Sequence, residues 1–124
     1  DLNGKQIGIL GLSFKPETDD MRESPAIDII KEMLNRGSRV KAFDPVAMEE
    51  AKHCLPEQVE YASDEYDAIR DADALVIVTE WNQFRALDMQ KVKNLLKSPK
   101  IADLRNVYEP KDMRELGFEY VGVG

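Results

Sequence analysis

Short apolar runs separated by polar stretches recur along the chain and predict buried β-strands. The clearest is Ala74 to Thr79, a nearly continuous apolar run of the kind that is buried on both faces of a parallel sheet. The other predicted strands are Ile7 to Gly11, Arg39 to Phe43, Val59 to Ala62, Lys100 to Leu104 and Phe118 to Val123. We therefore expect six strands, with residues 74–79 at the centre of the sheet.

Helix signals appear between these strands. Ser24 and Pro25 form an N-cap and a first-turn proline, apolar residues then repeat at helical spacing, and Gly37 marks the end. Asp44-Pro45 repeats the signal for a helix that reaches about Cys54. The remaining predicted helices are one capped by Ser63 that runs to about Asp71, one capped by Asp88 with Met89, Val92 and Leu96 on one face, and Pro110 to Leu116 before Gly117.

The alternation of strands and helices predicts the fold class. Right-handed crossovers between parallel strands give one doubly wound sheet with helices on both faces. We therefore expect an α/β, Rossmann-like fold of three layers with six strands in the order 3-2-1-4-5-6. Residues 1–124 are expected to form a single domain. Because the chain starts in the lead-in to a strand without an initiator Met, we expect it to be part of a longer protein.

Charge and cysteine content narrow the classes of partner. Asp and Glu number 24 against 17 Lys and Arg, so the net charge is −7 and nucleic acid is a poor candidate partner. The longest apolar run is too short to span a bilayer, and the N-terminus lacks the layout of a signal peptide. With one Cys and one His, no metal-ligand cluster is expected. A cytoplasmic protein fits these features.

Ligands of open parallel sheets bind beyond the carboxyl ends of the strands, near the point where the strand order reverses. Three predicted loops meet this condition: residues 13–24, 80–84 and 103–108. The first is about twice the usual length of such a connection and leads into a helix N-terminus. Lys15 and Arg22 flank that position, which favours a phosphate or diphosphate. Four acidic residues in the same loop are equally compatible with a solvated loop without a ligand.

Other residues of these loops have two interpretations each. Arg105 follows the fifth strand, where its guanidinium can serve phosphate or carbonyl groups or form a surface ion pair with Asp103 or Glu109. Trp81 and Phe84 are candidates for base stacking or a domain contact, although packing is the more common role of aromatic residues after a central strand.

Several alternatives are disfavoured on physical grounds. Gly8 and Gly11 do not complete a Gly-x-Gly-x-x-Gly turn, so a self-sufficient NAD site is not expected. Asp44 is interpreted as a helix cap and is left out of the site. Cys54 follows His53, but adjacent helix residues do not face each other and no cationic setting surrounds the thiol, so a structural or partly exposed cysteine is expected. No pair of groups in the three loops makes a base and a nucleophile, so no catalytic residue is expected in this chain.

The segment from Gly11 to Pro25, with the sequence GLSFKPETDDMRESP, resembles the C-terminal nucleotide-sugar-binding domain of the UDP-glucose 6-dehydrogenase family. The block from Ala74 to Phe84, with its Thr-Glu-Trp, and the block Asp103-Leu104-Arg105-Asn106 followed by Tyr108 and Pro110 agree with it. Family members are NAD-dependent oxidoreductases that convert UDP-glucose to UDP-glucuronate through a cysteine-bound intermediate. GDP-mannose and UDP-N-acetylhexosamine dehydrogenases remain alternatives, as does a non-catalytic nucleotide-binding module.

The resemblance implies roles for matching positions. Phe14, Lys15 and Arg105 correspond to residues that hold the UDP-sugar, and Arg22 corresponds to one that reaches NAD. The NAD-binding domain, the central helix and the catalytic cysteine of the family would precede this segment, and Cys54 does not match that cysteine. The resemblance therefore implies that the isolated chain is inactive and that its partners are UDP-sugar and the missing domains. The full-length parent is expected to be a homodimer or a larger oligomer.

Overall fold

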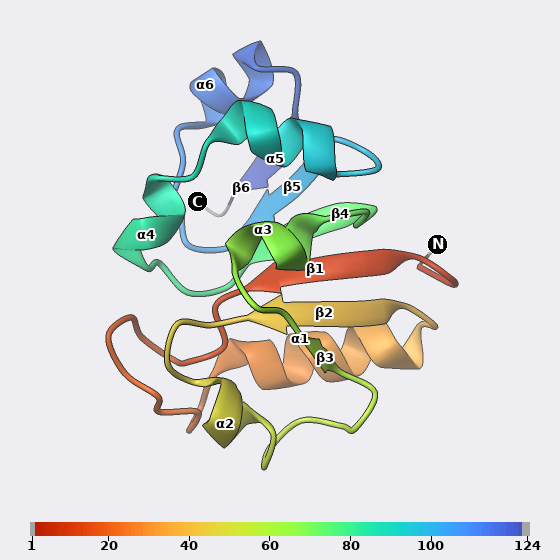
Figure 1. The fold of residues 1–124 in the computed structure, drawn as a ribbon, viewed down its shortest axis with the longest axis vertical. Coiled ribbons are helices and arrows are strands. Elements are labelled where there is room, and N and C mark those ends of the chain that lie inside the picture. The colour runs from red at the N-terminus through yellow and green to blue at the C-terminus, as the bar shows by residue number, and fades with distance from the viewer. Residues whose placement is uncertain (1, 123–124) are drawn as a thin grey trace.

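The computed structural model describes residues 2–122. Its centre is one six-stranded sheet in which every paired strand is parallel, with the order β3-β2-β1-β4-β5-β6 (Figure 1). The α/β fold class and the strand order predicted from the sequence are confirmed. The strands are β1 (Gln6–Leu10), β2 (Arg39–Phe43), β3 (Glu60–Tyr61), β4 (Ala74–Ile77), β5 (Lys100–Asp103) and β6 (Glu119–Gly122).

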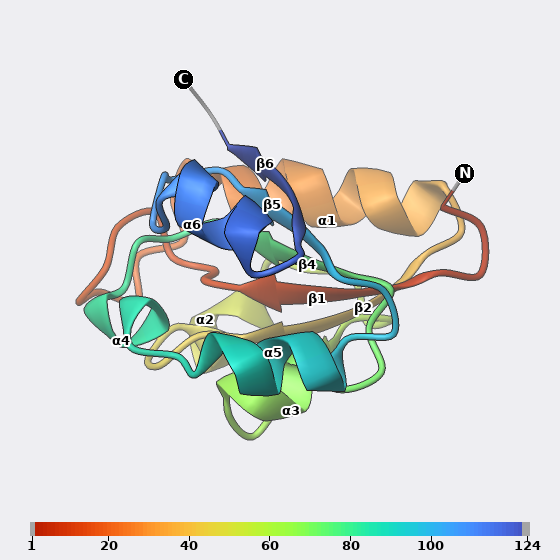
Figure 2. The same ribbon diagram turned by 90° about the horizontal axis from the view of Figure 1, so that it is seen from above.

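Helices cover the sheet on both faces. Figure 2 shows α1 on one side of the strands and α3 and α5 on the opposite side. The three-layer arrangement is therefore as predicted. The helices are α1 (Pro25–Asn35), α2 (Met48–Ala51), α3 (Glu65–Ile69), α4 (Asn82–Arg85), α5 (Met89–Leu95) and α6 (Pro110–Glu115).

The core consists of two apolar clusters, one on each face of the sheet. Along β1, Ile7 and Ile9 join the cluster that includes α1, while Leu10 joins the cluster that includes α3 and α5. Successive side chains of a strand point to opposite faces, so one strand contributes to both clusters. Burial on both faces explains why the central strands read as continuous apolar runs.

Three of the six helices within residues 2–122 begin as the sequence predicts, and three differ. Ser24 caps α1 and Asp88 caps α5, as predicted. The helix expected after Asp44-Pro45 is shorter than predicted, because the residues after Asp44 first form a turn and α2 begins at Met48. The cap of α3 is Asp64 rather than Ser63, and α4 occupies part of a segment expected to be a loop. Val123, the predicted end of the last strand, lies outside the described residues.

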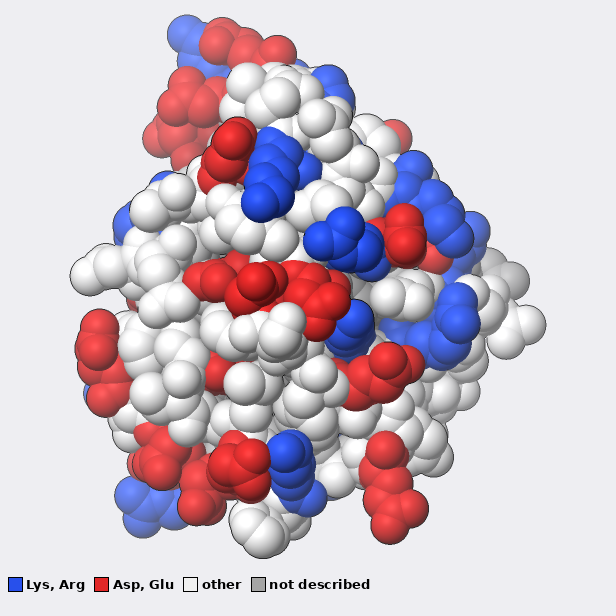
Figure 3. Space-filling model, in the orientation of Figure 1, with Lys and Arg blue, Asp and Glu red and all other residues white. Residues whose placement is uncertain are grey.

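No helix within residues 2–122 is long and apolar enough to cross a membrane. On the face of the molecule drawn in Figure 3, Lys and Arg side chains are interspersed with Asp and Glu side chains. This face therefore offers no continuous basic surface.

Candidate functional site

The loops after β1, β4 and β5 meet at one edge of the sheet, because β1 pairs with β4 and β4 pairs with β5. The chain leaves β1 through Gly11, whose φ of +94° lies in the left-handed region. A Cβ atom at this position would lie 2.5 Å from the Cβ and the backbone nitrogen of Thr79. A glycine is therefore needed for the first and fourth strands to end this close together.

Asp44 fixes the start of the loop after β1. One carboxylate oxygen accepts hydrogen bonds from the backbone N–H groups of Leu12 and Ser13 at 2.7 and 3.1 Å. The other accepts from Val46 and Ala47 at 3.0 and 2.9 Å. The interpretation of Asp44 as a helix cap is wrong, because α2 begins at Met48 without a side-chain cap and the second pair of bonds forms a turn before it. The position of Asp44 at the carboxyl end of β2, beside β1, was the available signal for the first pair.

The long loop after β1 is held at both ends by side-chain hydroxyls. Ser24 donates to the carbonyl oxygen of Leu12 and accepts from the backbone N–H of Ala26, so the α1 N-terminus already has a capping group. The Thr79 hydroxyl donates to the carbonyl oxygen of Ser13 at 2.7 Å. Within the loop, the N–H of Phe14 donates to the carbonyl of Asp20 at 2.9 Å. These hydrogen bonds fix the backbone conformation of the segment around Phe14.

Phe14 and Lys15 lie next to each other in this loop with different exposure. Phe14 is half-buried and Lys15 is exposed. The Lys15 ammonium lies 5.8 Å from the centroid of the Phe14 ring, within the range of a cation–π contact. Lys15 forms no ion pair with any residue in the range 2–122. Its charge is therefore available to an anion from solution.

Arg105 connects all three loops. Its Nε donates to the carbonyl oxygen of Val78 at 3.0 Å, and its Nη2 donates to the carbonyl oxygen of Phe14 at 3.0 Å. Its Nη1 lies 3.3 Å from a carboxylate oxygen of Glu80. The ion pairs considered for Arg105 from the sequence, with Asp103 or Glu109, are not formed. The structure brings Arg105 and Phe14 together.

Asp103 holds the backbone of the loop that carries Arg105 through hydrogen bonds. Its buried carboxylate accepts from the N–H groups of Arg105 and Tyr108 at 3.1 and 2.9 Å, and from the Tyr120 hydroxyl at 2.6 Å. Burial and the hydrogen bond to Asp103 raise the pKa of Tyr120 above its ordinary value. Sequence reasoning assigned no supporting role to Asp103, because the partner Tyr120 comes from another strand.

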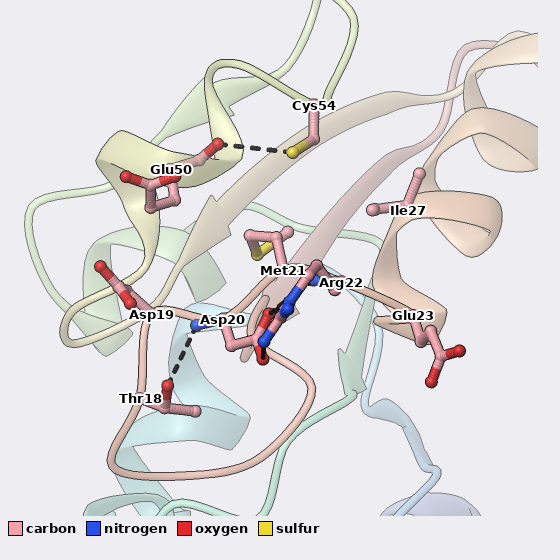
Figure 4. A pocket seen from close by; sticks show the side chains of 9 residues that line it. All are labelled: Thr18, Asp19, Asp20, Met21, Arg22, Glu23, Ile27, Glu50 and Cys54. Atoms are coloured by element: carbon pink, nitrogen blue, oxygen red, sulfur yellow. Dashed lines mark hydrogen bonds and ion pairs between the residues drawn. The ribbon is translucent and has the colours of Figure 1, made fainter.

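Arg22 lies in the exposed stretch of the loop after β1. Its side chain is 89% exposed and pairs with Asp20 at 3.0 Å. Hydrogen bonding from Arg22 lowers the pKa of the Asp20 carboxyl. Both residues line a hollow of about 720 Å³ between the loop and α2, shown in Figure 4. Phe14 and Arg22 share a smaller hollow of about 300 Å³.

The remaining candidates are two buried aromatic residues and an exposed cysteine. Trp81 and Phe84 are buried, at 4% and 0% exposure, so they pack in the core and do not stack on a ligand. The same burial leaves Trp81 without an exposed face for a domain contact. Cys54 is exposed, and its thiol lies 3.6 Å from the carbonyl oxygen of Glu50 (Figure 4). Among the described residues, no cluster of His, Cys, Asp and Glu is arranged to hold a metal ion.

Comparison with known proteins identifies a family and relatives that this chain matches. Residues 8–110 match the model of the UDP-glucose/GDP-mannose dehydrogenase family, UDP binding domain. The UDP-glucose 6-dehydrogenase of Rhizobium meliloti is 47% identical over 124 residues, covering 100% of this chain and 28% of that protein. The UDP-glucose 6-dehydrogenase of Bacillus subtilis is 45% identical over 123 residues, covering 99% of this chain and 27% of that protein.

Solved structures agree with the sequence relatives. A UDP-glucose dehydrogenase from Pyrobaculum islandicum aligns with a TM-score of 0.75 at 32% identity, over 98% of this chain and 25% of that one. An NDP-N-acetyl-D-galactosaminuronic acid dehydrogenase from Methanosarcina mazei aligns with a TM-score of 0.84 at 28% identity, over the same shares. The chain thus spans about 28% of the length of the Rhizobium relative. It belongs to the UDP-glucose/GDP-mannose dehydrogenase family and matches the UDP binding domain of that family.

Proposed function

We propose that this chain is the nucleotide-sugar-binding domain of an NAD-dependent UDP-glucose 6-dehydrogenase, which oxidises UDP-glucose to UDP-glucuronate. The chain holds the UDP part of the substrate through Phe14, Lys15 and Arg105. Identities of 45–47% with two UDP-glucose 6-dehydrogenases support UDP-glucose as the substrate of the parent enzyme. The binding energy of the nucleotide would orient the sugar for chemistry elsewhere in the parent.

One observation carries this proposal. Arg105 and Phe14 are 91 residues apart in the chain, yet the guanidinium of one donates to the carbonyl of the other at 3.0 Å. Lys15 follows Phe14 directly and carries an unpaired ammonium group within the described residues. Two cations and an aromatic ring therefore gather at the carboxyl edge of the sheet, where open α/β folds bind ligands. Cationic donors beside a ring suit a nucleoside diphosphate.

NAD supplies the hydride acceptor in such a reaction, and we do not place a complete site for it among residues 2–122. The turn after β1 lacks the glycine pattern that admits a pyrophosphate, and Ser24 caps the helix that follows. Arg22 is the one residue that we assign to NAD, as a single contact from the exposed loop. We place the remaining NAD contacts and the nucleophilic cysteine in segments of the parent outside these 124 residues.

Calorimetric titration of this chain with UDP, GDP and NAD, each alone at a stated salt concentration, tests the proposal. UDP is expected to bind, and GDP and NAD are expected to bind more weakly. Lys15→Ala should weaken UDP binding by about 1.5 to 3 kcal/mol, the contribution of a hydrogen bond to a charged group.

Lys97→Ala is the matched control. Lys97 is also exposed and precedes β5, at the opposite edge of the sheet, so its loss changes the net charge equally. Equal weakening by both variants would assign the effect to net charge and remove Lys15 from the site. A preference for GDP would move the parent to the GDP-mannose branch, and absence of UDP binding would contradict the proposed function of this chain.

A further inference from the structure

The three cationic residues assigned to ligands differ in their carboxylate partners. Arg22 pairs with Asp20, and Arg105 pairs with Glu80. Lys15 forms no ion pair among residues 2–122. At the edge where Arg105 meets the loop after β1, the Arg105–Glu80 pair is therefore neutral as a unit, while Lys15 carries a full positive charge.

Arg105 also retains donors for a ligand. A guanidinium has five N–H groups, and the bonds to Val78, Phe14 and Glu80 use one on each nitrogen. One N–H remains on Nη1 and one on Nη2, so the two remaining donors lie on adjacent nitrogens. The side chains of Arg105 and Glu80 are 26% and 31% exposed, so both are accessible from solution at this edge.

We propose that Glu80 is a specificity-determining residue that directs Arg105 to the uncharged part of the nucleotide. This inference rests on the proposed function. Because Glu80 neutralises Arg105, the two remaining guanidinium donors suit carbonyl or hydroxyl oxygens of the base and ribose. A diphosphate placed beside the pair would meet the carboxylate as well as the guanidinium, and like charges repel. Lys15, which forms no ion pair among residues 2–122, receives the diphosphate.

This division explains why an acidic residue is present at an anion-binding edge. Two backbone carbonyls already fix the position of the guanidinium, so Glu80 is not needed to hold it there. Glu80 adds a negative charge, which the backbone carbonyls cannot supply. The substitution Glu80→Gln separates these roles, because the amide oxygen can still accept from Nη1 while the charge is removed.

Titration of this chain with uridine, UDP and inorganic diphosphate, followed by NMR at low salt, tests the inference. Glu80→Gln is expected to strengthen diphosphate binding about threefold to fivefold, the effect of removing one exposed ion-pair partner, and to leave uridine binding within about twofold. Arg105→Ala should weaken uridine and UDP by similar factors. Lys15→Ala should weaken UDP and diphosphate by similar factors and affect uridine least.

Two results would overturn the inference. One is an unchanged or lower diphosphate affinity in Glu80→Gln, which would leave Glu80 as a structural neighbour of Arg105. The other is a larger loss of diphosphate than of uridine affinity in Arg105→Ala. If UDP binds the unsubstituted chain and either result is found, the inference alone fails. If UDP does not bind that chain, the proposed function fails and the inference falls with it.

Discussion

The guanidinium of Arg105 donates from Nη2 to the carbonyl oxygen of Phe14 at 3.0 Å, and this bond joins the loop after β5 to the loop after β1. Because a second bond from Nε reaches Val78 at the end of β4, one side chain ties three neighbouring strand ends together. The positions of Phe14 and Lys15 are therefore coupled to Arg105. Substitution of Arg105 should change both stability and ligand binding.

Arg105→Lys is the conservative test of this coupling. A lysine ammonium is a point charge without the planar fork, so it cannot serve the carbonyls of Phe14 and Val78 in the observed geometry. We expect the free energy of unfolding to fall by about 1 to 2 kcal/mol, because a half-buried carbonyl loses its donor. UDP affinity should fall about tenfold, the equivalent of 1.4 kcal/mol at the site. Urea denaturation and calorimetry measure the two quantities.

Arg36→Lys is the control for this variant. Arg36 forms an exposed ion pair with Glu32 at 2.8 Å on α1, and such pairs contribute little. Its unfolding free energy should change by less than about 0.5 kcal/mol. A full retention of UDP affinity in Arg105→Lys would show that the fork geometry is unimportant for binding.

The fold could be predicted because its signals are local. The apolar run of β4 and the Ser24-Pro25 start of α1 are each readable within a few residues, and parallel crossovers then restrict the strand order. The errors were local as well. The length of α2 depends on the turn that the Asp44 carboxylate makes with Val46 and Ala47, and the sequence pattern of a capped helix is the same with or without that turn.

The meeting point of the three loops could be predicted from the sequence, and the contacts within it could not. Parallel strands place Arg105 and the loop after β1 at one edge, so their proximity follows from topology. The hydrogen-bond acceptors of Arg105 do not follow from topology, since two of them are backbone carbonyls, which have no signature in the sequence. The pairing with Glu80 depends on how far β4 and β5 extend before their loops begin. Only the three-dimensional structure distinguishes the Arg105–Glu80 ion pair from the alternative pairs with Asp103 or Glu109.

Tyr120→Phe tests the hydrogen bond between Tyr120 and Asp103, the residue that holds the loop of Arg105. Its hydroxyl donates to the buried carboxylate of Asp103 at 2.6 Å, so its removal should cost about 1 to 2 kcal/mol at neutral pH. Burial and the bond to Asp103 raise the pKa of Tyr120, so above about pH 10 the unfolded chain releases this proton and the folded chain keeps it. Stability of the unsubstituted chain should therefore fall as the pH rises through this range.

Urea denaturation at pH values on both sides of about 10 measures this effect. The phenylalanine variant lacks this proton, so its stability should fall less steeply, and the difference between the two proteins should shrink at high pH. Parallel curves would contradict a Tyr120 hydroxyl that is neutral and bonded to Asp103.

Asp67→Asn addresses the acid side of the pH range. The Asp67 carboxylate accepts from the backbone N–H of Ser63 at 2.9 Å and from the Lys41 ammonium at 3.0 Å, and these bonds lower its pKa. A lowered pKa means that the stabilisation is complete above the unfolded value of about 3.9 and is lost as the pH falls through the folded value. We expect Asp67→Asn to be less stable by about 1 kcal/mol at neutral pH.

The difference between Asp67→Asn and the unsubstituted chain should close as the pH falls below about 4. Thermal denaturation at a series of pH values gives the comparison. Glu57→Gln is the control, because Glu57 is exposed and forms no hydrogen bond through its side chain among the described residues. A constant difference at all pH values would mean that Asp67 stabilises the fold by packing and not by its charge.

Gly11→Ala and Gly4→Ala form a matched pair that separates backbone strain from crowding at the site. Both glycines have positive φ, +94° at Gly11 and +76° at Gly4. A Cβ atom at Gly4 meets nothing within 4 Å, so its substitution should cost about 1 to 2 kcal/mol, the penalty of a left-handed alanine. A Cβ atom at Gly11 would lie 2.5 Å from the backbone nitrogen of Thr79, so the same substitution also forces two strand ends apart.

Gly11→Ala should therefore lose more unfolding free energy than Gly4→Ala, by at least about 1 kcal/mol, since overpacking of a closely packed contact adds to the strain. It should also weaken UDP binding, because Thr79 holds the carbonyl of Ser13 and so the loop that carries Phe14 and Lys15. Urea denaturation and UDP titration of both variants provide the comparison. Equal losses of stability would mean that the strand ends separate without cost. Undiminished UDP binding by folded Gly11→Ala would show that the loop reaches its binding position without this contact.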